Sequence, residues 1–446
     1  MTPDHPPRPP LSHIDPAALK DALRPRAAGH VSGVVGLLAE GYCPGAAVGD
    51  LVEIHSERRR ITAEVVGLRD GKMLMVGLDD LRGIGLGARI EHRGLAASVS
   101  CSPHLLGRVL DARGAVLDRA NGPIAGPFEW RPIYAPAPGP FERRLIDEPL
   151  PVGIRVVDGL LTLGQGQRIG IMAGAGVGKS TLIGSMARHT AADVIVIGLI
   201  GERGREVMEF LERTLPQEAR ARCVTVVATS ERSPLERTRG AFVATSIAEY
   251  FAGSGRSVLL LIDSVTRFAM AQRELGLSMG EPPATRGYTP SVFAMLPRLL
   301  ERAGRFRRGG SITGIYTVLV EGDDLNDPVG DAARSILDGH LVLSRDLAAV
   351  GHFPAVDVLA SISRVASTVC SPPHVDAARR VRRIIARIAE GQELRQIGAY
   401  VAGADPELDR ALALRPAMDT FCQQGDAEAT AFADTVRAMG QLAEAA

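Results

Sequence analysis

The segment 173–181 reads Ala173-Gly174-Ala175-Gly176-Val177-Gly178-Lys179-Ser180-Thr181. An apolar, strand-like run precedes it at 168–172, and a helical pattern that begins at Leu182 follows it. A glycine-rich loop between a strand and a helix, ending in Gly-Lys-Ser, is the arrangement that a phosphate-binding P-loop requires. The glycines let successive backbone N–H groups and the helix N-terminus point at an anion. This stretch therefore predicts a nucleoside triphosphate site within an α/β fold.

Individual residues of this loop have separate expected roles. Lys179 should reach the β- and γ-phosphates of ATP, and the Ser180 hydroxyl should bind Mg²⁺. The other residues of the predicted nucleotide cradle are Gly174, Ala175, Gly176, Val177, Gly178 and Thr181. Lysine is rare in this chain, because only Lys20, Lys72 and Lys179 are lysines among the 51 basic residues. The wide guanidinium of arginine could not replace a compact ammonium between phosphates, so a lysine kept at 179 supports this assignment.

Composition limits the classes of protein that this chain could be. Its 446 residues are enough for about two to four domains. A formal net charge of +0 gives no whole-chain reason to expect a nucleic acid or an anionic membrane as partner. The five cysteines include no C-x-x-C pair, which favours reduced thiols over disulfides or a zinc site. Without a signal peptide or an apolar run of roughly 20 residues, we expect a soluble cytoplasmic protein.

The first hundred residues divide into an arm and a small domain. Residues 1–28 are rich in proline and predict a disordered arm, either a flexible tail or a docking segment that folds on a partner. In the second case, a short helix starting at Asp15-Pro16 would carry Leu19 and Leu23 on one face. Residues 29–98 contain short strand-like runs between turn signals, which predicts a small β-barrel or a sandwich, and we expect the β-barrel. Only Tyr42 supplies an aromatic ring near these runs, so the barrel lacks the stacking platforms of an oligonucleotide-binding domain.

The rest of the chain predicts an ATPase core and a helical domain. Within 99–372, strand candidates alternate with helical stretches and lie at 193–200, 223–228, 257–262, 311–320 and 340–343. This alternation predicts a mostly parallel, helix-covered sheet. Residues 121–151, rich in proline and glycine, predict a long connection over its surface. Residues 373–446 predict helices only, with one amphipathic stripe through Val381 and Ile385 and later helix starts at Pro406 and Pro416.

Two carboxylates follow predicted strands of this core. Asp263 ends the apolar run 258–262, which has the form of a Walker B strand and would place Asp263 beside Mg²⁺. Glu202 stands at the end of the strand that follows the P-loop helix. Because that edge of an open α/β sheet faces the ligand, Glu202 could polarise the attacking water. The alternative is an exposed acid at the start of a helix.

Arg364 follows a further apolar strand, in the run Ser361-Ile362-Ser363-Arg364. An arginine at this point could stabilise charge on the γ-phosphate, either within its own chain or in the site of a neighbour. The pattern by itself does not choose between the two. A separate cluster of arginines at 379–383 is expected to be solvated or to lie at a subunit interface, with binding to an acidic surface as the alternative.

As a set, these motifs resemble the rotary-type ATPases, and closely the flagellar and type III secretion export ATPases. Besides the P-loop, the matching stretches are 198–207, 263–274, 280–288, 321–324, 351–355 and 360–364. The resemblance runs from about residue 30 to residue 425. Within the group, the stretches 282–289, 398–400 and 403–406 are more similar to the flagellar export ATPase than to the injectisome ATPase.

The resemblance implies a homohexameric ring that hydrolyses ATP between its subunits to drive protein export. Each subunit would contain an N-terminal β-barrel, a RecA-like P-loop ATPase core and a C-terminal helical domain. Carried over by motif, Glu202 is the catalytic carboxylate, Arg203 and Arg267 are cations on the phosphate side, and Arg364 is an arginine finger acting on a neighbour. Phe353 falls where the rotary catalytic subunit has an adenine-stacking tyrosine.

The same resemblance implies binding partners and a place in the cell. A stator-like regulator would bind the N-terminal arm, and a central-stalk-like protein and export chaperone or substrate complexes would bind the C-terminal domain. The ring would work in the cytoplasm, peripherally at the inner membrane beside the membrane export gate.

Two other classes of protein remain as alternatives. A hexameric RNA motor would need an aromatic-rich barrel, and an ATP synthase subunit would need a paralogous partner. One chain that carries both Glu202 and Arg364 can build equivalent sites without a paralogue.

Overall fold

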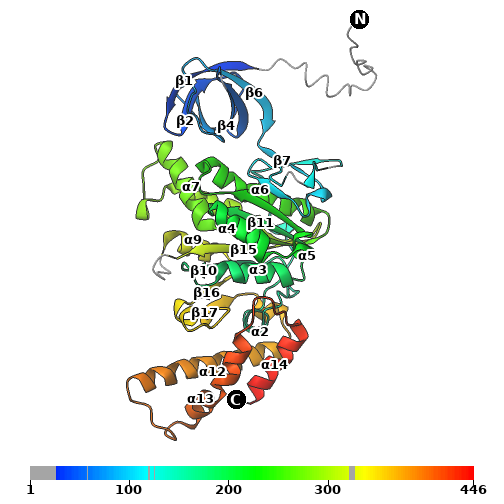
Figure 1. Ribbon diagram of the computed structural model, residues 1–446, viewed down its shortest axis with the longest axis vertical. Coiled ribbons are helices and arrows are strands. Elements are labelled where there is room, and N and C mark those ends of the chain that lie inside the picture. Colours follow the sequence, from blue (N-terminus) through cyan, green and yellow to red (C-terminus); the bar gives the residue numbers. More distant parts are fainter. Residues whose placement is uncertain (1–26, 58, 119–120, 125, 321–326, 446) are drawn as a thin grey trace, which may run out of the picture. The chain divides into compact units, whose positions relative to one another are not determined.

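The computed structural model describes residues 27–57, 59–118, 121–124, 126–320 and 327–445 (Figure 1). The chain divides into two compact units, Met1–Ala96 and Ala97–Ala446. The helix expected to start at Asp15-Pro16 and the matching stretch 321–324 lie outside the described residues. Among the helices that the structure does describe, none has the length and apolar character of a membrane span.

The first unit is a closed, antiparallel β-barrel. Its strands are β1 (Ala28–Val35), β2 (Leu38–Tyr42), β3 (Asp50–His55), β4 (Arg60–Arg69), β5 (Lys72–Gly77) and β6 (Arg89–Ala96). They are hydrogen-bonded in the order β1-β2-β5-β4-β3-β6, and β6 pairs with β1 to close the barrel. Alternate residues of a strand point inward, so that Val52 and Ile54 of β3 are fully buried in the barrel core. The predicted N-terminal β-barrel is therefore confirmed.

The second unit is built on a mostly parallel sheet with the order β17-β16-β10-β15-β13-β11-β12-β8. The strands are β8 (Val109–Asp111), β10 (Arg168–Ala173), β11 (Val194–Ile200), β12 (Cys223–Ala228), β13 (Ser257–Asp263), β14 (Gly304–Arg305), β15 (Ser311–Leu319), β16 (Gly339–Leu343) and β17 (Val356–Ser363). Among these strands, only β17 at one edge and the short β14 run antiparallel to their neighbours. This is the sheet that the alternation of strands and helices predicts.

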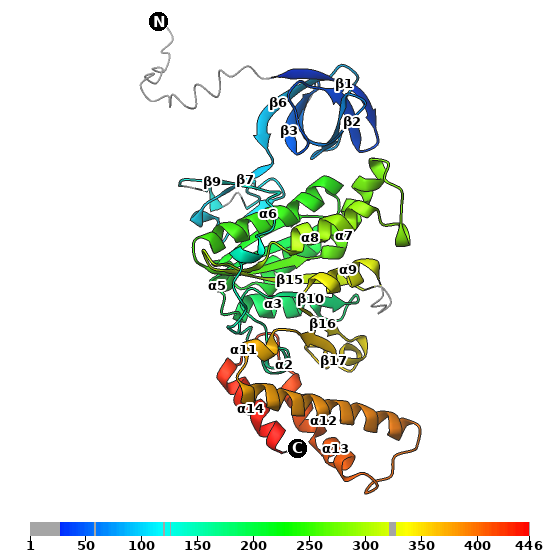
Figure 2. The same cartoon turned by 180° about the vertical axis from the view of Figure 1, so that it is seen from behind.

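Helices cover both faces of this sheet (Figures 1 and 2). On β11, Ile195 belongs to the core shared with Leu182 of α3, and Val196 belongs to the core shared with Phe242 of α6. The helices are α2 (Arg155–Leu160), α3 (Lys179–His189), α4 (Gly204–Glu209), α5 (Gln217–Arg220), α6 (Pro234–Gly253), α7 (Val265–Ser278), α8 (Pro290–Leu300), α9 (Pro328–Ile336), α10 (Arg345–Ala349) and α11 (Ala366–Val369). Shorter elements are β7 (Ser98–Cys101), β9 (Glu129–Pro132), 3₁₀ helices at Pro103–Leu105, Pro140–Glu142 and Thr285–Gly287, and a π-helix (Phe210–Thr214).

Three helices end the chain: α12 (Pro372–Gln396), α13 (Pro406–Cys422) and α14 (Phe432–Glu444). Asp405 caps α13 by accepting the backbone N–H groups of Glu407 and Leu408, both at 3.0 Å. The expected helix start at Pro416 is wrong, because Pro416 lies inside α13. Buried Leu412 and Phe421 on either side of the proline keep the helix packed through that point. The fold class is therefore an α/β P-loop core with an N-terminal β-barrel and a C-terminal helical domain.

Candidate active site

The P-loop connects β10, which ends at Ala173, to α3, which begins at Lys179. Gly176 and Gly178 have backbone φ angles of 77° and 87°, in the left-handed region that glycine adopts without steric cost. A loop of this form presents its backbone N–H groups to an anion in front of the helix. Ser180, in the first turn of α3, is exposed. The structure thus places the predicted nucleotide cradle on one turn at the edge of the sheet.

Lys179 is surrounded by the two carboxylates that the sequence singles out. Its Nζ forms an ion pair with Oδ1 of Asp263 and lies 3.6 Å from Oε1 of Glu202. Asp263 ends β13 and Glu202 follows the adjacent, parallel strand β11, so both side chains reach the same edge of the sheet. Thr317, on β15, donates its hydroxyl to Oδ1 of Asp263 at 2.7 Å. The structure therefore brings together a cation, a proposed metal ligand and a candidate base.

The Glu202 carboxyl has a pKa above its ordinary value. Burial is the main cause, and the pKa of Glu202 is raised to about 7 although the nearby Lys179 ammonium opposes the shift. The charge of Asp263 and a hydrogen bond with Glu206 raise it further. Glu206 has a lowered pKa because it receives that hydrogen bond. The cluster beside the P-loop therefore contains a carboxyl with a pKa near neutrality.

Two arginines flank this cluster in different ways. Arg203 precedes α4, and its side chain is 80% exposed, with a 3.3 Å ion pair to Glu206. Arg267, on α7, lies against Gly201, where an added Cβ would come within 2.7 Å of its side chain. Within the described part of the chain, the buried Nε of Arg267 has no hydrogen-bond partner. Arg267 is therefore packed next to the segment that carries Glu202, whereas the exposed Arg203 has room to move toward a ligand.

Arg364 lies far from the P-loop of its own chain. Strand β17 runs antiparallel to β16, and the backbone N–H of Arg364 donates at 3.0 Å to the carbonyl of Asp338, directly before β16. The Asp338 carboxylate in turn accepts from Nε of Arg168, the first residue of β10, at 3.1 Å. The P-loop follows the other end of β10, and a strand of six residues spans about 20 Å. The structure therefore does not bring Arg364 to its own P-loop.

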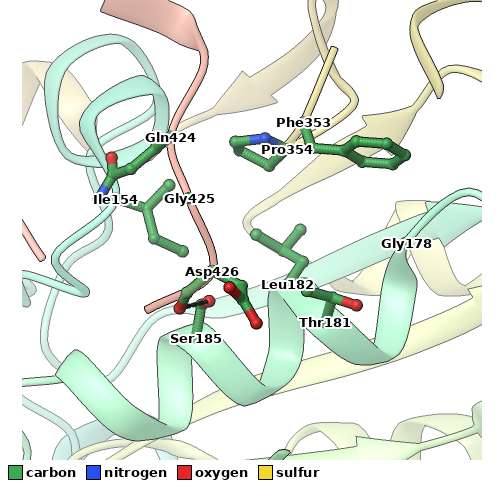
Figure 3. Close-up of a pocket in the computed structure, with 10 residues that line it drawn as sticks. All are labelled: Ile154, Gly178, Thr181, Leu182, Ser185, Phe353, Pro354, Gln424, Gly425 and Asp426. Carbon is green, nitrogen blue, oxygen red and sulfur yellow. Dashed lines mark hydrogen bonds between the residues drawn. The ribbon is translucent and has the colours of Figure 1, made fainter. Parts of the chain in front are cut away.

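A small pocket lies beside the first turns of α3 (Figure 3). Phe353 forms one wall, is 44% exposed, and has its ring close enough to Gly178 that an added Cβ there would lie 3.3 Å from it. The segment 424–426, which follows α13, forms the opposite wall. A half-exposed ring next to the P-loop is suited to stack on a nucleotide base.

The comparisons with known proteins agree with this geometry. Residues 153–363 match the ATP synthase alpha/beta family, nucleotide-binding domain, and residues 370–441 match the T3SS EscN ATPase C-terminal domain. The chain is 50% identical to the flagellum-specific ATP synthase of Treponema pallidum, over 95% of each chain. It belongs to the family of flagellar and type III secretion ATPases.

Similar proteins occur in both branches of this export ATPase family. The chain is 48% identical to the type 3 secretion system ATPase of Sinorhizobium fredii, over 93% of this chain and 92% of that protein. It also matches the structure of the assembled ATPase EscN in complex with its central stalk EscO, from enteropathogenic E. coli. That match has a TM-score of 0.86 and 42% identity, and covers 93% of this chain and 100% of the EscN chain.

One wall of the pocket, formed by the segment 424–426, is not predicted by the sequence. Gln424 is buried, and its Nε2 donates to the carbonyls of Gly153 at 2.7 Å and Glu428 at 2.8 Å. Its backbone N–H donates to the carbonyl of Phe353 at 2.9 Å. Ser185 of α3 donates to the carbonyl of Asp426 at 2.8 Å. No local motif marks these residues, because they reach the site only through the packing of the C-terminal helices.

Proposed function

We propose that this protein is the ATPase that energises the export of flagellar proteins, hydrolysing ATP to ADP and phosphate. The observation that carries the proposal is the cluster of Lys179, Asp263 and Glu202 at the carboxyl edge of the sheet, directly beside the P-loop. It holds a phosphate-binding cation and a base in one place, as hydrolysis of a phosphoanhydride requires. The flagellar assignment is supported by the 50% identity to the Treponema pallidum protein.

In the proposed mechanism, the loop N–H groups and Lys179 hold the phosphates while Phe353 stacks on the base. Glu202, once deprotonated, accepts a proton from the attacking water. Arg203 and Arg267 balance charge on the phosphate side. Mg²⁺, when bound, would neutralise phosphate charge and is a hard cation that prefers oxygen ligands. The Ser180 hydroxyl and the Asp263 carboxylate supply such oxygens, so the donor set fits this ion.

The proposal includes a homohexameric ring with the nucleotide between subunits. Arg364 lies at the opposite edge of the sheet from its own P-loop, so it serves as an arginine finger for a neighbouring chain. The similarity to EscN, whose structure is that of the assembled ATPase, supports this arrangement. Because one chain carries both Glu202 and Arg364, every site of the ring is equivalent.

The proposed partners follow from the export function. They are a stator-like regulator on the N-terminal arm, a central-stalk-like protein and chaperone or substrate complexes at the C-terminal domain, and the membrane export gate. The stalk is supported by the EscN relative, whose structure contains its central stalk EscO. The ring would work in the cytoplasm at the inner membrane, without a nucleic-acid partner.

Deletion of the gene in its own bacterium tests the assignment. We expect loss of flagellar filaments, restored by the wild-type gene and not by a Lys179→Ala copy. Intact filaments, together with loss of effector secretion, would instead assign the protein to an injectisome, which the 48% identity to the Sinorhizobium fredii ATPase keeps as the second candidate. Turnover that rises when RNA is added would reject both assignments.

A further inference from the structure

Two glutamates and a histidine meet on the outer face of the β-barrel. Val52 and Ile54 of β3 are buried in the barrel core, so Glu53 and His55, which alternate with them, point outward. Glu91 of the neighbouring strand β6 is paired directly with Glu53 (Figure 2). The register of the two strands therefore places two carboxylates and an imidazole side by side on one face.

The pairing of Glu53 with Glu91 calls for a positive charge between the two side chains. Like charges directly opposite each other in an antiparallel ladder destabilise the sheet. The side chains of Glu53 and Glu91 are only 10% and 16% exposed, so water screens their repulsion weakly. Arg89 forms an ion pair with Oε1 of Glu91 at 2.9 Å, which leaves Oε2 of Glu91 on the side of His55.

The imidazole of His55 lies close to both carboxylates. Its Nε2 is 3.4 Å from Oε2 of Glu91 and 3.8 Å from Oε2 of Glu53. One ligand atom from each of the three residues lies within 4.8 Å of the other two. A tetrahedral Zn²⁺ ion with bonds of about 2.0–2.2 Å separates its ligand atoms by about 3.4 Å. The three side chains are therefore spaced almost as zinc ligands are.

The same nitrogen of His55 has an unmet requirement for a partner. Nε2 is buried and makes no hydrogen bond to any residue that the structure describes, although two carboxylates lie near it. A buried polar atom without a partner costs about 1–3 kcal/mol. A metal ion bound between the carboxylates would satisfy this nitrogen and neutralise the two negative charges together.

We propose that Glu53, His55 and Glu91 bind a divalent transition-metal ion, with Zn²⁺ as the ion that this ligand set fits best. An imidazole combined with carboxylates suits Zn²⁺, whereas Mg²⁺ and Ca²⁺ prefer oxygen ligands. Three protein ligands leave the fourth position of a tetrahedral ion to water. The ion would join β3 to β6, the strand that closes the barrel by pairing with β1. This barrel site is separate from the nucleotide site and does not depend on the proposed function.

Calorimetric titration of the full chain with Zn²⁺ tests the barrel site. The protein is first treated with a chelator and dialysed, and the buffer contains Mg²⁺ but no nucleotide. The wild type should bind a single Zn²⁺ per chain. Because loss of an outer-shell partner alone typically lowers metal affinity about 10–100-fold, loss of the imidazole in His55→Gln should lower it by at least about 100-fold.

His92→Gln is the matched control, because His92 lies in the same barrel but pairs with one carboxylate only, that of Asp50 at 2.8 Å. This variant should bind Zn²⁺ as the wild type does. Glu91→Gln should lower the affinity at least about tenfold and serves as the second ligand variant if His55→Gln does not fold. Circular dichroism establishes that each variant is folded before it is titrated.

Thermal unfolding gives a second measurement of the same site. Since a ligand that binds only the folded state stabilises it, Zn²⁺ should raise the Tm of the wild type and of His92→Gln, and not that of His55→Gln. A wild type that binds no Zn²⁺, or a folded His55→Gln with unchanged affinity, would overturn the inference. Loss of binding in Cys370→Ser instead would assign the metal to the pair of Cys370 and His374, whose Sγ and Nε2 are 4.0 Å apart, and would also overturn it.

Discussion

At the scale of single residues, the mechanism that we propose depends on the protonation of Glu202. Its carboxyl is largely buried, lies 3.6 Å from Nζ of Lys179 and shares a hydrogen bond with Glu206. Burial outweighs the attraction of the lysine, so the pKa is raised to about 7. If Glu202 is the general base that we propose, it must lose this proton before it can accept one from water.

Glu202→Gln should preserve ATP binding and lower turnover by about 10²–10⁴, the usual scale for loss of a positioned base. The amide keeps the size of the side chain but cannot accept a proton. Nucleotide affinity and steady-state hydrolysis are to be measured on one preparation, with Glu209→Gln on the exposed face of α4 as control. A variant that hydrolyses ATP at the wild-type rate would remove Glu202 from the mechanism.

The pH profile of kcat/KM should carry the signature of the same group. Because a general base works unprotonated, kcat/KM should rise with pH through about 7 and level off above it. Glu206→Gln removes a neighbouring charge that raises this pKa, so the rising limb should move to lower pH. A limb that stays in place in Glu206→Gln would show that the titrating group is not Glu202.

At the scale of elements, the short helix α2 joins the ATPase core to the C-terminal helices. Gly159 of α2 lies so close to α13 and α14 that an added Cβ would come within 3.0 Å of Phe421 and 3.3 Å of Thr435. The Asp158 carboxylate accepts the backbone N–H groups of Val152 at 2.9 Å and Gly153 at 2.8 Å, which holds the turn before α2. Asp158 is completely buried, and burial raises its pKa to about 7.

Asp158 should make the folded state less stable as pH rises. Its folded pKa lies above the unfolded value, so the native state binds more protons between about pH 4 and pH 7 and its stability falls across that window. Asp158→Asn removes this titration, and the difference in unfolding free energy between variant and wild type should therefore shift in favour of the variant from about pH 4 to about pH 7. Denaturant unfolding at several pH values measures it. A constant difference would contradict the assigned pKa.

At the scale of the whole molecule, the position of Arg364 links chemistry to assembly. Its N–H is bound to Asp338, which pairs with the first residue of β10, a strand length away from the P-loop of the same chain. Hydrolysis should then need two neighbouring chains, so that activity per chain rises with protein concentration as rings form. Removal of such a finger typically lowers turnover by about 10³–10⁵.

Mixed rings test this arrangement directly. Inactive Arg364→Ala chains combined with inactive Lys179→Ala chains should regain part of the wild-type activity, because one chain supplies the P-loop and its neighbour supplies the arginine. An arginine acting within its own chain would give no rescue, since every site would lack one group. Mixed assembly is confirmed by co-purification of differently tagged chains. Confirmed mixed rings without activity would refute the trans assignment.

The sequence by itself determined the centre of the site. A P-loop depends on local backbone geometry, which the glycines at 176 and 178 make accessible, so nine consecutive residues predict it. Asp263 and Glu202 could be placed nearby because the ends of parallel strands meet at one edge of a sheet. Short strand runs likewise predicted a small all-β domain, a barrel or a sandwich, and helical periodicity predicted the C-terminal helical domain.

Only the tertiary structure decided what lies around that centre. Gln424 reaches the pocket because α13 and α14 pack on α2, and its bond to Gly153 joins residues 271 positions apart, which no local pattern encodes. Because β17 pairs antiparallel with β16, Arg364 lies at the end of the sheet opposite the P-loop. The motif around Arg364 does not predict whether it acts within its own chain or on a neighbour. Burial likewise kept α13 helical through Pro416. Short stretches of sequence determine local backbone conformation. The walls of a pocket and the surfaces between subunits depend instead on which helix and sheet faces pack together.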